Sequence, residues 1–214
     1  MKSFCVIGLG KFGQAVAETL AAAGRQVMII DIDSDKVTAM ADIVTNAVIG
    51  DPTNETVLRA AGVADYECAI VCLNNNINAS ILLTIMLKEI GIKKVVARAM
   101  NDGHRKVLEH IGADQIVFPE QDTGEKLGYM LTKNNITDFV DFSDYKIVEM
   151  VVPEEWQGKS LMELNLRRRY SVNVIAVSLA DGTVTVSPDP DRPFGEGDKV
   201  SVIGADKDID KLIN

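Results

Sequence analysis

The sequence has no apolar run that approaches the roughly 20 residues needed to cross a bilayer as a helix. Its longest candidate, Ile81–Leu87, ends at Lys88 and Glu89. A secretory signal is also missing, because Met1-Lys2-Ser3 leads directly into a predicted core strand without an apolar h-region or a small-residue cleavage site. We therefore expect a cytoplasmic protein that is neither exported nor inserted into a membrane.

Cysteine and basic charge are both scarce. Cys5, Cys68 and Cys72 lie in apolar strand patterns without metal-like clustering, which is typical of buried thiols in a reducing compartment. The 22 Lys and Arg residues against 31 Asp and Glu residues give a formal net charge of -9, which repels the phosphates of nucleic acids. The one basic cluster, Arg167-Arg168-Arg169, is more typical of a solvated turn or a small anion site. We expect no nucleic-acid partner.

Up to about residue 118 the sequence alternates short β-branched runs with amphipathic stretches, the pattern of a parallel sheet flanked by helices. The runs predict strands near 3–7, 27–31, 47–49, 69–73, 94–98 and 115–118. The stretches between them predict helices near 11–23, 34–42, 54–61, 76–90 and 102–111. Together they predict an α/β fold of the Rossmann type, with a doubly wound parallel sheet.

The pattern changes after Phe118-Pro119. An amphipathic stretch near 120–133 predicts a crossover helix, and the polar-aromatic segment Asp138–Tyr145 is interpreted as a linker. Short β runs follow at 147–152, 172–178, 183–186 and 200–203, with a hairpin at Asp181-Gly182 and a small helix near 160–164. We expect two domains: residues 1–134, which include the crossover helix, and residues 135–214, a smaller α+β domain.

The segment Gly8-Leu9-Gly10-Lys11-Phe12-Gly13 directly follows an apolar strand, and Asp31 ends the next strand 18 residues further on. Gly8 permits a tight turn, Gly10 lets the backbone approach a pyrophosphate, and Gly13 allows close packing of helix and sheet. The helix N-terminus that follows offers free N–H groups to phosphates, and Asp31 can accept from ribose hydroxyls. This spacing predicts a nucleotide-binding site; the alternative is an empty turn of the same fold.

Groups for catalysis are missing from the second predicted domain. Residues 135–214 contain no His and no Cys, and both histidines, His104 and His110, lie in the first domain. A dehydrogenase needs an acid or base beside the nicotinamide. Tyr129 and Lys133 have the spacing of the pair used by short-chain reductases, but they fall on the helix that leaves the sheet, where ordinary surface positions explain them. We therefore expect no enzyme activity.

With these elements the chain resembles the regulator-of-potassium-conductance family, and within it the cytosolic gating subunits of Trk/Ktr potassium-uptake systems. The resemblance spans essentially the whole chain. It is carried by the segments Val6–Gly13, Asp31–Asp33, Gly50–Thr53, Lys106–Asp114 and Phe118–Glu120.

The resemblance implies a Rossmann domain, a crossover helix that pairs subunits and a small C-terminal domain, with homodimers assembled into a homo-octameric ring. It also implies that ATP, ADP or NAD(H) binds as a regulatory ligand without turnover. From the inner face of the cell membrane, the ring would switch a membrane potassium-translocating subunit of the Trk/Ktr type. A ligand can do this only through its different affinities for two conformations.

The positions that match the family's nucleotide site follow the predicted strands. Asp31 and Asp33 match ribose positions and would repel the 2′-phosphate of NADP, and adenine is expected near Asp51 and Pro52. Lys11 stands where family members often have Arg and could reach a terminal phosphate; the alternative is an exposed lysine. The predicted contacts are Gly8, Gly10, Lys11, Phe12, Gly13, Asp31, Ile32, Asp33, Asp51, Pro52, Leu73, Asn74, Asn75, Arg98 and His104.

His104 and Glu120 both match positions of the family, and each allows a second interpretation. His104 matches a position that faces the nucleotide in the family, but a lone histidine at a helix start is as readily a capping or surface group. Glu120 matches an acid that helps to hold a divalent cation, Mg²⁺ or Ca²⁺, beside ATP phosphates. A glutamate at a helix N-terminus is equally favoured by the helix dipole.

The second domain holds a pattern that resembles the cyclic-di-AMP signature of Gram-positive C-terminal domains. Its residues are Leu161, Met162, Asn165, Arg167, Asn173 and Val174. Arginine can pair with a phosphate oxygen and asparagine can read an adenine edge, and two chains related by symmetry would grip the symmetric ligand. The alternative is that the apolar members are core residues and Arg167 is a surface residue.

Two other functions stay open at this stage. An NAD-dependent oxidoreductase would rest on the glycine motif and Asp31. A regulatory subunit of another channel or antiporter would use the same kind of cytosolic ring.

Overall fold

The computed structural model describes residues 2–74, 76–133 and 135–213. Their contacts divide the chain into two compact units, Met1–Glu120 and Gln121–Asn214, each with its own sheet and core. The contact boundary falls within the first turn of helix α6 (Pro119–Leu131). The domain boundary that the sequence places at residue 134 stays a prediction.

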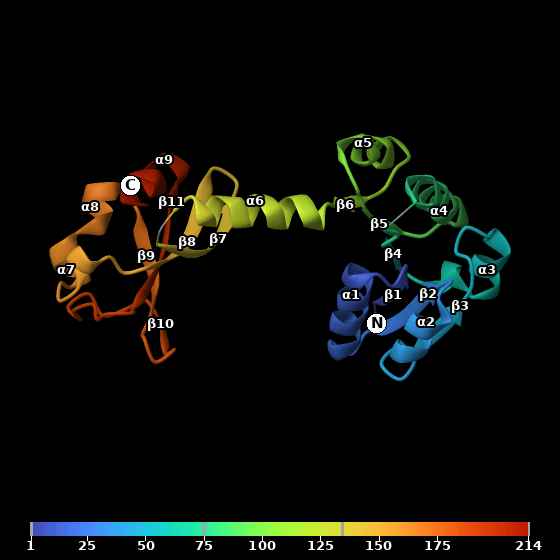
Figure 1. Ribbon diagram of the computed structural model, residues 1–214, viewed down its shortest axis with the longest axis horizontal. Coiled ribbons are helices and arrows are strands. Elements are labelled where there is room, and N and C mark those ends of the chain that lie inside the picture. Colours follow the sequence, from blue (N-terminus) through green and yellow to red (C-terminus); the bar gives the residue numbers. More distant parts are fainter. Residues whose placement is uncertain (1, 75, 134, 214) are drawn as a thin grey trace. The chain divides into compact units, whose positions relative to one another are not determined.

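The first unit contains a six-stranded sheet whose neighbouring strands are all parallel (Figure 1). The strands are β1 (Ser3–Ile7), β2 (Gln26–Asp31), β3 (Asn46–Ile49), β4 (Cys68–Val71), β5 (Lys94–Arg98) and β6 (Gln115–Val117), in the order β3-β2-β1-β4-β5-β6. The connections contain α1 (Lys11–Ala22), α2 (Ser34–Met40), α3 (Glu55–Ala60), a 3-10 helix (Val63–Asp65), α4 (Ile77–Ile90) and α5 (Asp102–His110). The predicted Rossmann-type sheet is confirmed.

Apolar layers cover both faces of this sheet. Successive residues of a strand point to opposite faces, so Ile7 belongs to the layer shared with α3, α4 and α5, whereas Val6 belongs to the layer shared with α1 and α2. Burial on both sides explains why the central strands are continuous apolar runs in the sequence. The loops at the carboxyl ends of the strands are then the part of the sheet available for ligand contacts.

The second unit contains a five-stranded antiparallel sheet in the order β10-β9-β11-β8-β7 (Figure 1). Its strands are β7 (Ile136–Phe142), β8 (Tyr145–Val151), β9 (Asn173–Ser178), β10 (Val184–Val186) and β11 (Lys199–Ala205). A 3-10 helix (Glu154–Trp156) and the helices α7 (Leu161–Leu164), α8 (Leu166–Tyr170) and α9 (Asp206–Ile213) accompany them. The prediction of a second, α+β fold is confirmed.

The segment interpreted as a linker forms strand β7, so that interpretation is wrong. The register of β7 against β8 shifts between Ile136 and Asp138, and Ile136 and Phe139 are both buried. These two residues are three positions apart, because the irregularity adds a residue and interrupts the alternation that marks a strand in a sequence. Val140 and Phe142 are exposed on this edge strand, which also obscures the pattern.

The sequence pattern does not predict helices α8 and α9. Both are short, with five and eight residues, and short helices depend on tertiary packing more than on propensity. Helix α9, for example, buries Ile209 and Leu212 against the core of the second unit. No helix in the part of the chain that the structure describes has the length and apolar character needed to cross a membrane.

Candidate functional site

A cavity of about 390 Å³ opens at the carboxyl edge of the first unit's sheet. It lies where β1 and β4 are neighbours, the point at which the strand order reverses. Open α/β sheets bind ligands at this switch point. The lining residues are Gly8, Leu9, Gly10, Asp31, Ile32, Lys36, Asp51, Pro52, Thr53, Cys72, Leu73, Asn74, Asn76 and Ala79.

The turn after β1 requires glycine at two positions. Gly8 has a φ of 97°, in the left-handed region, and its N–H donates to the Ile30 carbonyl at 2.9 Å. A Cβ on Gly13 would collide with the Gly8 carbonyl oxygen, a backbone atom that cannot turn away. Helix α1 follows with Gly10 as its N-cap, so no N-cap side chain occupies its first-turn N–H groups. This backbone cradle is suited to phosphate oxygens.

The Asp31 carboxylate ties this turn to the loop after β2. Its Oδ2 accepts from the Leu9 N–H at 2.5 Å, and its Oδ1 accepts from the Asp33 N–H at 2.9 Å. Each carboxylate oxygen can accept more than one hydrogen bond, so Asp31 can still accept from ribose hydroxyls at the cavity wall. This placement is compatible with the role that the spacing predicts for Asp31.

Asp33 has a structural role beside the cavity. Its Oδ1 accepts from the N–H groups of Asp35 and Lys36, at 3.1 and 3.3 Å, so that it forms the N-cap of α2. Its Oδ2 lies 3.0 Å from the Lys36 Nζ, and this hydrogen-bonded pair lowers the pKa of Asp33. Lys36 lines the cavity. Its positive charge therefore lies beside Asp31 and Asp33, the two acids that are expected to repel a 2′-phosphate.

The loop after β3 brings Asp51, Pro52 and Thr53 to the cavity. The Asp51 Oδ1 accepts from the Thr53 hydroxyl at 2.7 Å and from the Thr53 N–H at 2.9 Å, which lowers the pKa of Asp51. Cys72 also lines the cavity, but burial raises the pKa of its thiol to about 12. A protonated thiol is a poor nucleophile, so Cys72 contributes packing at neutral pH.

Eight of the predicted contacts line the cavity: Gly8, Gly10, Asp31, Ile32, Asp51, Pro52, Leu73 and Asn74. Six others do not, namely Lys11, Phe12, Gly13, Asp33, Arg98 and His104, and Asn75 lies outside the described residues. The functional roles of all of them stay predictions.

Six lining residues are absent from the sequence prediction: Leu9, Lys36, Thr53, Cys72, Asn76 and Ala79. Leu9, Thr53 and Cys72 are direct neighbours of predicted residues, so a wider selection from the same loops would include them. Lys36 and Ala79 lie in the first turns of α2 and α4, and only the packing of those helices turns them toward the cavity.

Arg98, at the end of β5, is 9% exposed and joins two predicted residues. Its Nη1 donates to the Asn74 Oδ1, and its Nη2 and Nε donate to the Glu120 carboxylate, the latter over 3.4 Å. Glu120, the predicted cation ligand, is thus paired with a guanidinium. The described residues contain no group of three His, Cys, Asp or Glu side chains that could hold a metal ion. By themselves, they do not build a divalent-cation site.

His104 is 2% exposed although it lies in the first turn of α5. Its Nδ1 accepts from the Met100 N–H at 3.3 Å, which leaves the proton of the neutral ring on Nε2. That Nε2 is buried and has no hydrogen-bond partner among the described residues. Burial lowers the pKa of His104, so the ring is neutral at pH 7. The N-cap of α5 is Asn101, whose Oδ1 accepts from the His104 N–H at 2.8 Å, and the buried His104 ring is not a surface group.

A second cavity of about 390 Å³ lies in the second unit. It brings together all six residues of the cyclic-di-AMP pattern, with Leu166 and Val172 as further lining residues. A capping box of Ser160 and Glu163 starts α7, and Asn165 between α7 and α8 has a left-handed φ of 45°. Met162 is 61% exposed and is therefore not a core residue.

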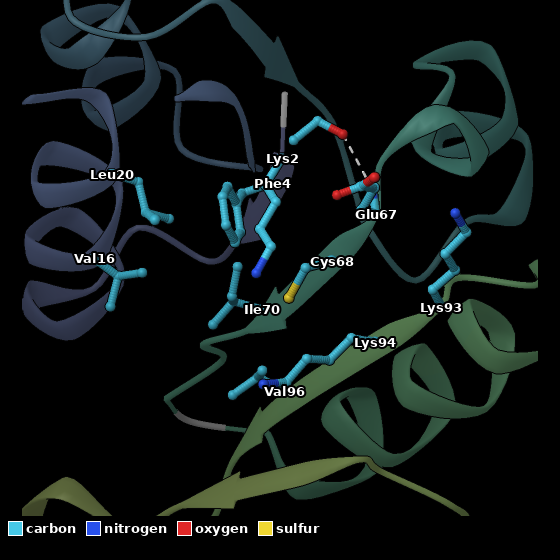
Figure 2. A pocket seen from close by; sticks show the side chains of 11 residues that line it. Lys2, Phe4, Val16, Leu20, Glu67, Cys68, Ile70, Lys93, Lys94 and Val96 are labelled. Atoms are coloured by element: carbon cyan, nitrogen blue, oxygen red, sulfur yellow. Dashed lines mark hydrogen bonds between the residues drawn. The ribbon is translucent and has the colours of Figure 1, made fainter. Parts of the chain in front are cut away.

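A third hollow of about 450 Å³ lies toward the amino-terminal ends of β1, β4 and β5 (Figure 2). Its apolar lining includes Phe4, Val16, Leu20, Ile70 and Val96, and the lysines that line it are Lys2, Lys93 and Lys94. None of the predicted site residues lines it. This hollow is therefore separate from both candidate ligand sites.

Comparisons with known proteins agree with the division into two units. The TrkA-N domain model matches residues 4–119, and the TrkA-C domain model matches residues 147–214. Ktr system potassium uptake protein C of Bacillus subtilis is 40% identical over 212 residues, which cover 99% of this chain and 96% of that protein. Ktr system potassium uptake protein A of the same organism is 39% identical over 214 residues, with 100% and 96% covered. Both relatives are potassium uptake proteins, which agrees with the expectation of no enzyme activity.

Solved structures show the same fold. A structure of the GsuK channel superposes with a TM-score of 0.72 at 20% identity and covers 99% of this chain and 38% of the channel chain. The AMP-bound C-terminal domain of Kef from Shewanella denitrificans has a TM-score of 0.54 at 24% identity, with 61% of this chain and 80% of that chain covered. The predicted two-part fold is therefore also found in the GsuK channel.

Proposed function

Because the chain belongs to the family of potassium uptake proteins with TrkA-N and TrkA-C domains, we propose that it is a nucleotide-binding regulatory subunit of a Trk/Ktr-type potassium uptake system. The observation that carries this proposal is the cavity at the glycine turn, where Gly10, Asp31 and Asp51 meet. The subunit would act from the cytoplasmic face on a membrane potassium-translocating subunit. Its nucleotide would be a regulatory ligand that is not turned over.

The cavity lining suggests where each part of an adenine nucleotide would lie. The pyrophosphate would occupy the turn at Gly8–Gly10, the ribose would bind Asp31, and adenine would lie toward Asp51 and Pro52. Lys11 is exposed at the start of α1 and would reach a terminal phosphate of its own or of a neighbouring subunit. Other structures of the GsuK channel hold NAD and ADP, so both belong among the ligands to be tested.

The second cavity would bind cyclic-di-AMP. Arg167 would pair with a phosphate oxygen, and Asn165 or Asn173 would read an adenine edge. Because the ligand has two identical halves, two copies of the chain would present this cavity to it, as expected for a homodimer. Such dimers, assembled into an octameric ring, would transmit the effect of both ligands.

A divalent cation, Mg²⁺ or Ca²⁺, would need more than Glu120. The carboxylate of Glu120 is paired with Arg98, and either ion takes six or more oxygen ligands, or keeps several waters. Nucleotide phosphates and a second chain would have to supply the remaining ligands, and Arg98 would have to release the carboxylate.

The experiment is calorimetric titration with ATP, ADP, NADH and cyclic-di-AMP, each with and without Mg²⁺, on a sample whose mass is measured by light scattering. We expect adenine nucleotides to bind a ring-sized oligomer without being consumed. Steady turnover of NADH with a small substrate, or binding of none of the four ligands, would contradict the proposal.

Two variants and one control test the site. Asp31→Ala should weaken the binding of all adenine nucleotides. The control is Asp35→Ala, which should leave their binding unchanged, because Asp35 is an exposed acid in the first turn of α2 that does not line the cavity. Lys11→Ala should weaken ATP more than ADP or NADH. Equal losses for the three nucleotides would refute the terminal-phosphate role of Lys11.

A further inference from the structure

The orientation of the Asn74 amide is set by its neighbour Arg98. An arginine side chain carries only hydrogen-bond donors, so the Asn74 atom that faces it must be the carbonyl oxygen. The structure has this arrangement, with the Arg98 Nη1 donating to the Asn74 Oδ1. The NH₂ group of Asn74 is consequently directed to the other side of the amide.

On that other side lies the glycine turn. Of the atoms around the position that a Gly10 Cβ would take, the nearest is the Asn74 Nδ2. Asn74 and Gly10 both line the cavity. The amide therefore presents a hydrogen-bond donor at the place where the backbone is suited to phosphate oxygens.

Arg98 is itself held from its far end. It does not line the cavity and is 9% exposed, and Glu120 accepts from its Nε and Nη2. Glu120 belongs to the first turn of α6, and its side chain is 60% exposed. A chain of contacts thus runs from the first turn of α6 through Arg98 and Asn74 to the glycine turn.

We propose that Arg98 is a positioning residue, anchored by Glu120, that turns the Asn74 NH₂ group toward the phosphates of a bound adenine nucleotide. This inference rests on the proposed function of the cavity. In the reversed amide orientation, the Asn74 oxygen would face the phosphates and repel them. Arg98 removes that orientation without touching the ligand, and the first turn of α6 becomes coupled to nucleotide affinity. By linkage, the nucleotide also stabilises the Arg98–Glu120 contact.

The test uses ADP and adenosine as probes, because adenosine has no phosphate for Asn74 to contact. Asn74→Ala should lower the affinity for ADP by about tenfold, since a hydrogen bond to a charged group is lost. The affinity for adenosine should stay unchanged. Arg98→Met should weaken ADP by about threefold to tenfold for the same reason, again with adenosine unchanged. The ratio of the two affinities is a readout that a merely structural role of Arg98 would not change.

A double-mutant cycle tests whether Arg98 acts through Asn74. In the Asn74→Ala background, Arg98→Met should cause no further loss of ADP affinity. The matched control is Arg59→Met, which removes an exposed Arg–Glu pair in the same unit outside the cavity and should leave both ligands unchanged. Glu120→Gln should lower the affinity for ADP by about twofold to threefold, because a neutral amide binds the Arg98 guanidinium less tightly than a carboxylate does.

If Arg98→Met does not fold, Arg98→Lys replaces it in the test. Lysine keeps the charge but cannot contact both Asn74 and Glu120 with its single donor atom. Arg98→Lys should therefore lower the ratio of the ADP affinity to the adenosine affinity. Additive losses in the double variant, or an unchanged ratio in Arg98→Met or Arg98→Lys, would overturn the positioning role while wild-type ADP binding supports the proposed function. A wild-type chain that binds no ADP would overturn both.

Discussion

The two candidate ligand cavities have the same volume, about 390 Å³, but the backbone contributes to them differently. The first is shaped by the backbone: a left-handed Gly8, a Gly13 packed against the Gly8 carbonyl, and a helix N-terminus without a capping side chain. The second is lined by side chains that project from α7, α8 and the start of β9.

This difference determines which changes each cavity tolerates. Added atoms damage the glycine turn of the first cavity, because backbone atoms cannot move aside independently of the fold. Removed atoms damage a site whose recognition groups are side chains, while the fold around it persists. Four predictions follow, from the largest expected effect to the smallest: the first three test this contrast, and the fourth concerns a buried histidine of the first unit.

The largest effect is expected for Gly13→Ala in the first unit. Its Cβ would collide with the Gly8 carbonyl oxygen, so α1 must shift against β1. We expect the free energy of unfolding, measured with urea, to fall by about 3 kcal/mol. Gly128→Ala is the matched control in the second unit: nothing lies within 4 Å of its Cβ, and alanine favours α6 by up to about 1 kcal/mol. Equal stability of both variants would refute the collision.

Arg167→Ala should act on ligand binding and not on stability. Arg167 is exposed on α8 and lines the second cavity. Calorimetry should show an affinity for cyclic-di-AMP that is lower by at least about tenfold, because a charged pair with phosphate is lost. The free energy of unfolding should change by no more than about 0.5 kcal/mol. Arg168→Ala, on the same helix but outside the lining, should bind normally. An equal loss in Arg168→Ala would mean that net charge, and not the cavity, attracts the ligand.

Asn165 separates conformation from recognition in the second cavity. Its left-handed φ of 45° costs an alanine about 1 kcal/mol but costs a glycine nothing. Urea unfolding should therefore show Asn165→Ala destabilised by about 1 kcal/mol and Asn165→Gly close to wild type. Both should bind cyclic-di-AMP more weakly by calorimetry. Normal binding by Asn165→Gly would assign Asn165 a purely conformational role.

The smallest effect is the pH dependence contributed by His104. Burial lowers its pKa below the ordinary 6.5, so the unfolded chain takes up a proton that the folded chain resists. This contribution to stability is fully present above pH 6.5 and is lost as the pH falls from 6.5 toward the lower folded pKa. As the pH falls across this window, the midpoint temperature of thermal unfolding should decrease more steeply for wild type than for His104→Gln.

His110→Gln is the control for that measurement, because His110 is exposed and its Nδ1 contacts only the Lys106 carbonyl in the described structure. It should keep the steeper decline, because it leaves His104 in place. A steeper decline in His104→Gln than in wild type would contradict the buried, neutral ring.

The sequence predicts the parallel sheet and the glycine turn because both depend on local rules. Continuous apolar runs report burial on both faces of β1, β2 and β4, and a glycine spacing reports the positions that tolerate no side chain. The six residues of the cyclic-di-AMP pattern were likewise identified together and share one cavity. Strand β7 is missed because its irregular register interrupts the alternation on which strand prediction depends.

Residue types and spacing indicate the fold, and the resemblance to the family that they carry adds to the residues predicted for the first cavity, of which eight line it. Tertiary structure decided how two other predicted residues are used: Arg98 lies behind Asn74, and Glu120 is paired with Arg98. The physical reason is that side-chain pairing joins strands and helices that are 20 or more residues apart, as with Arg98 and Glu120. Local sequence patterns carry the backbone conformation, but only the packed fold brings such partners within hydrogen-bonding distance.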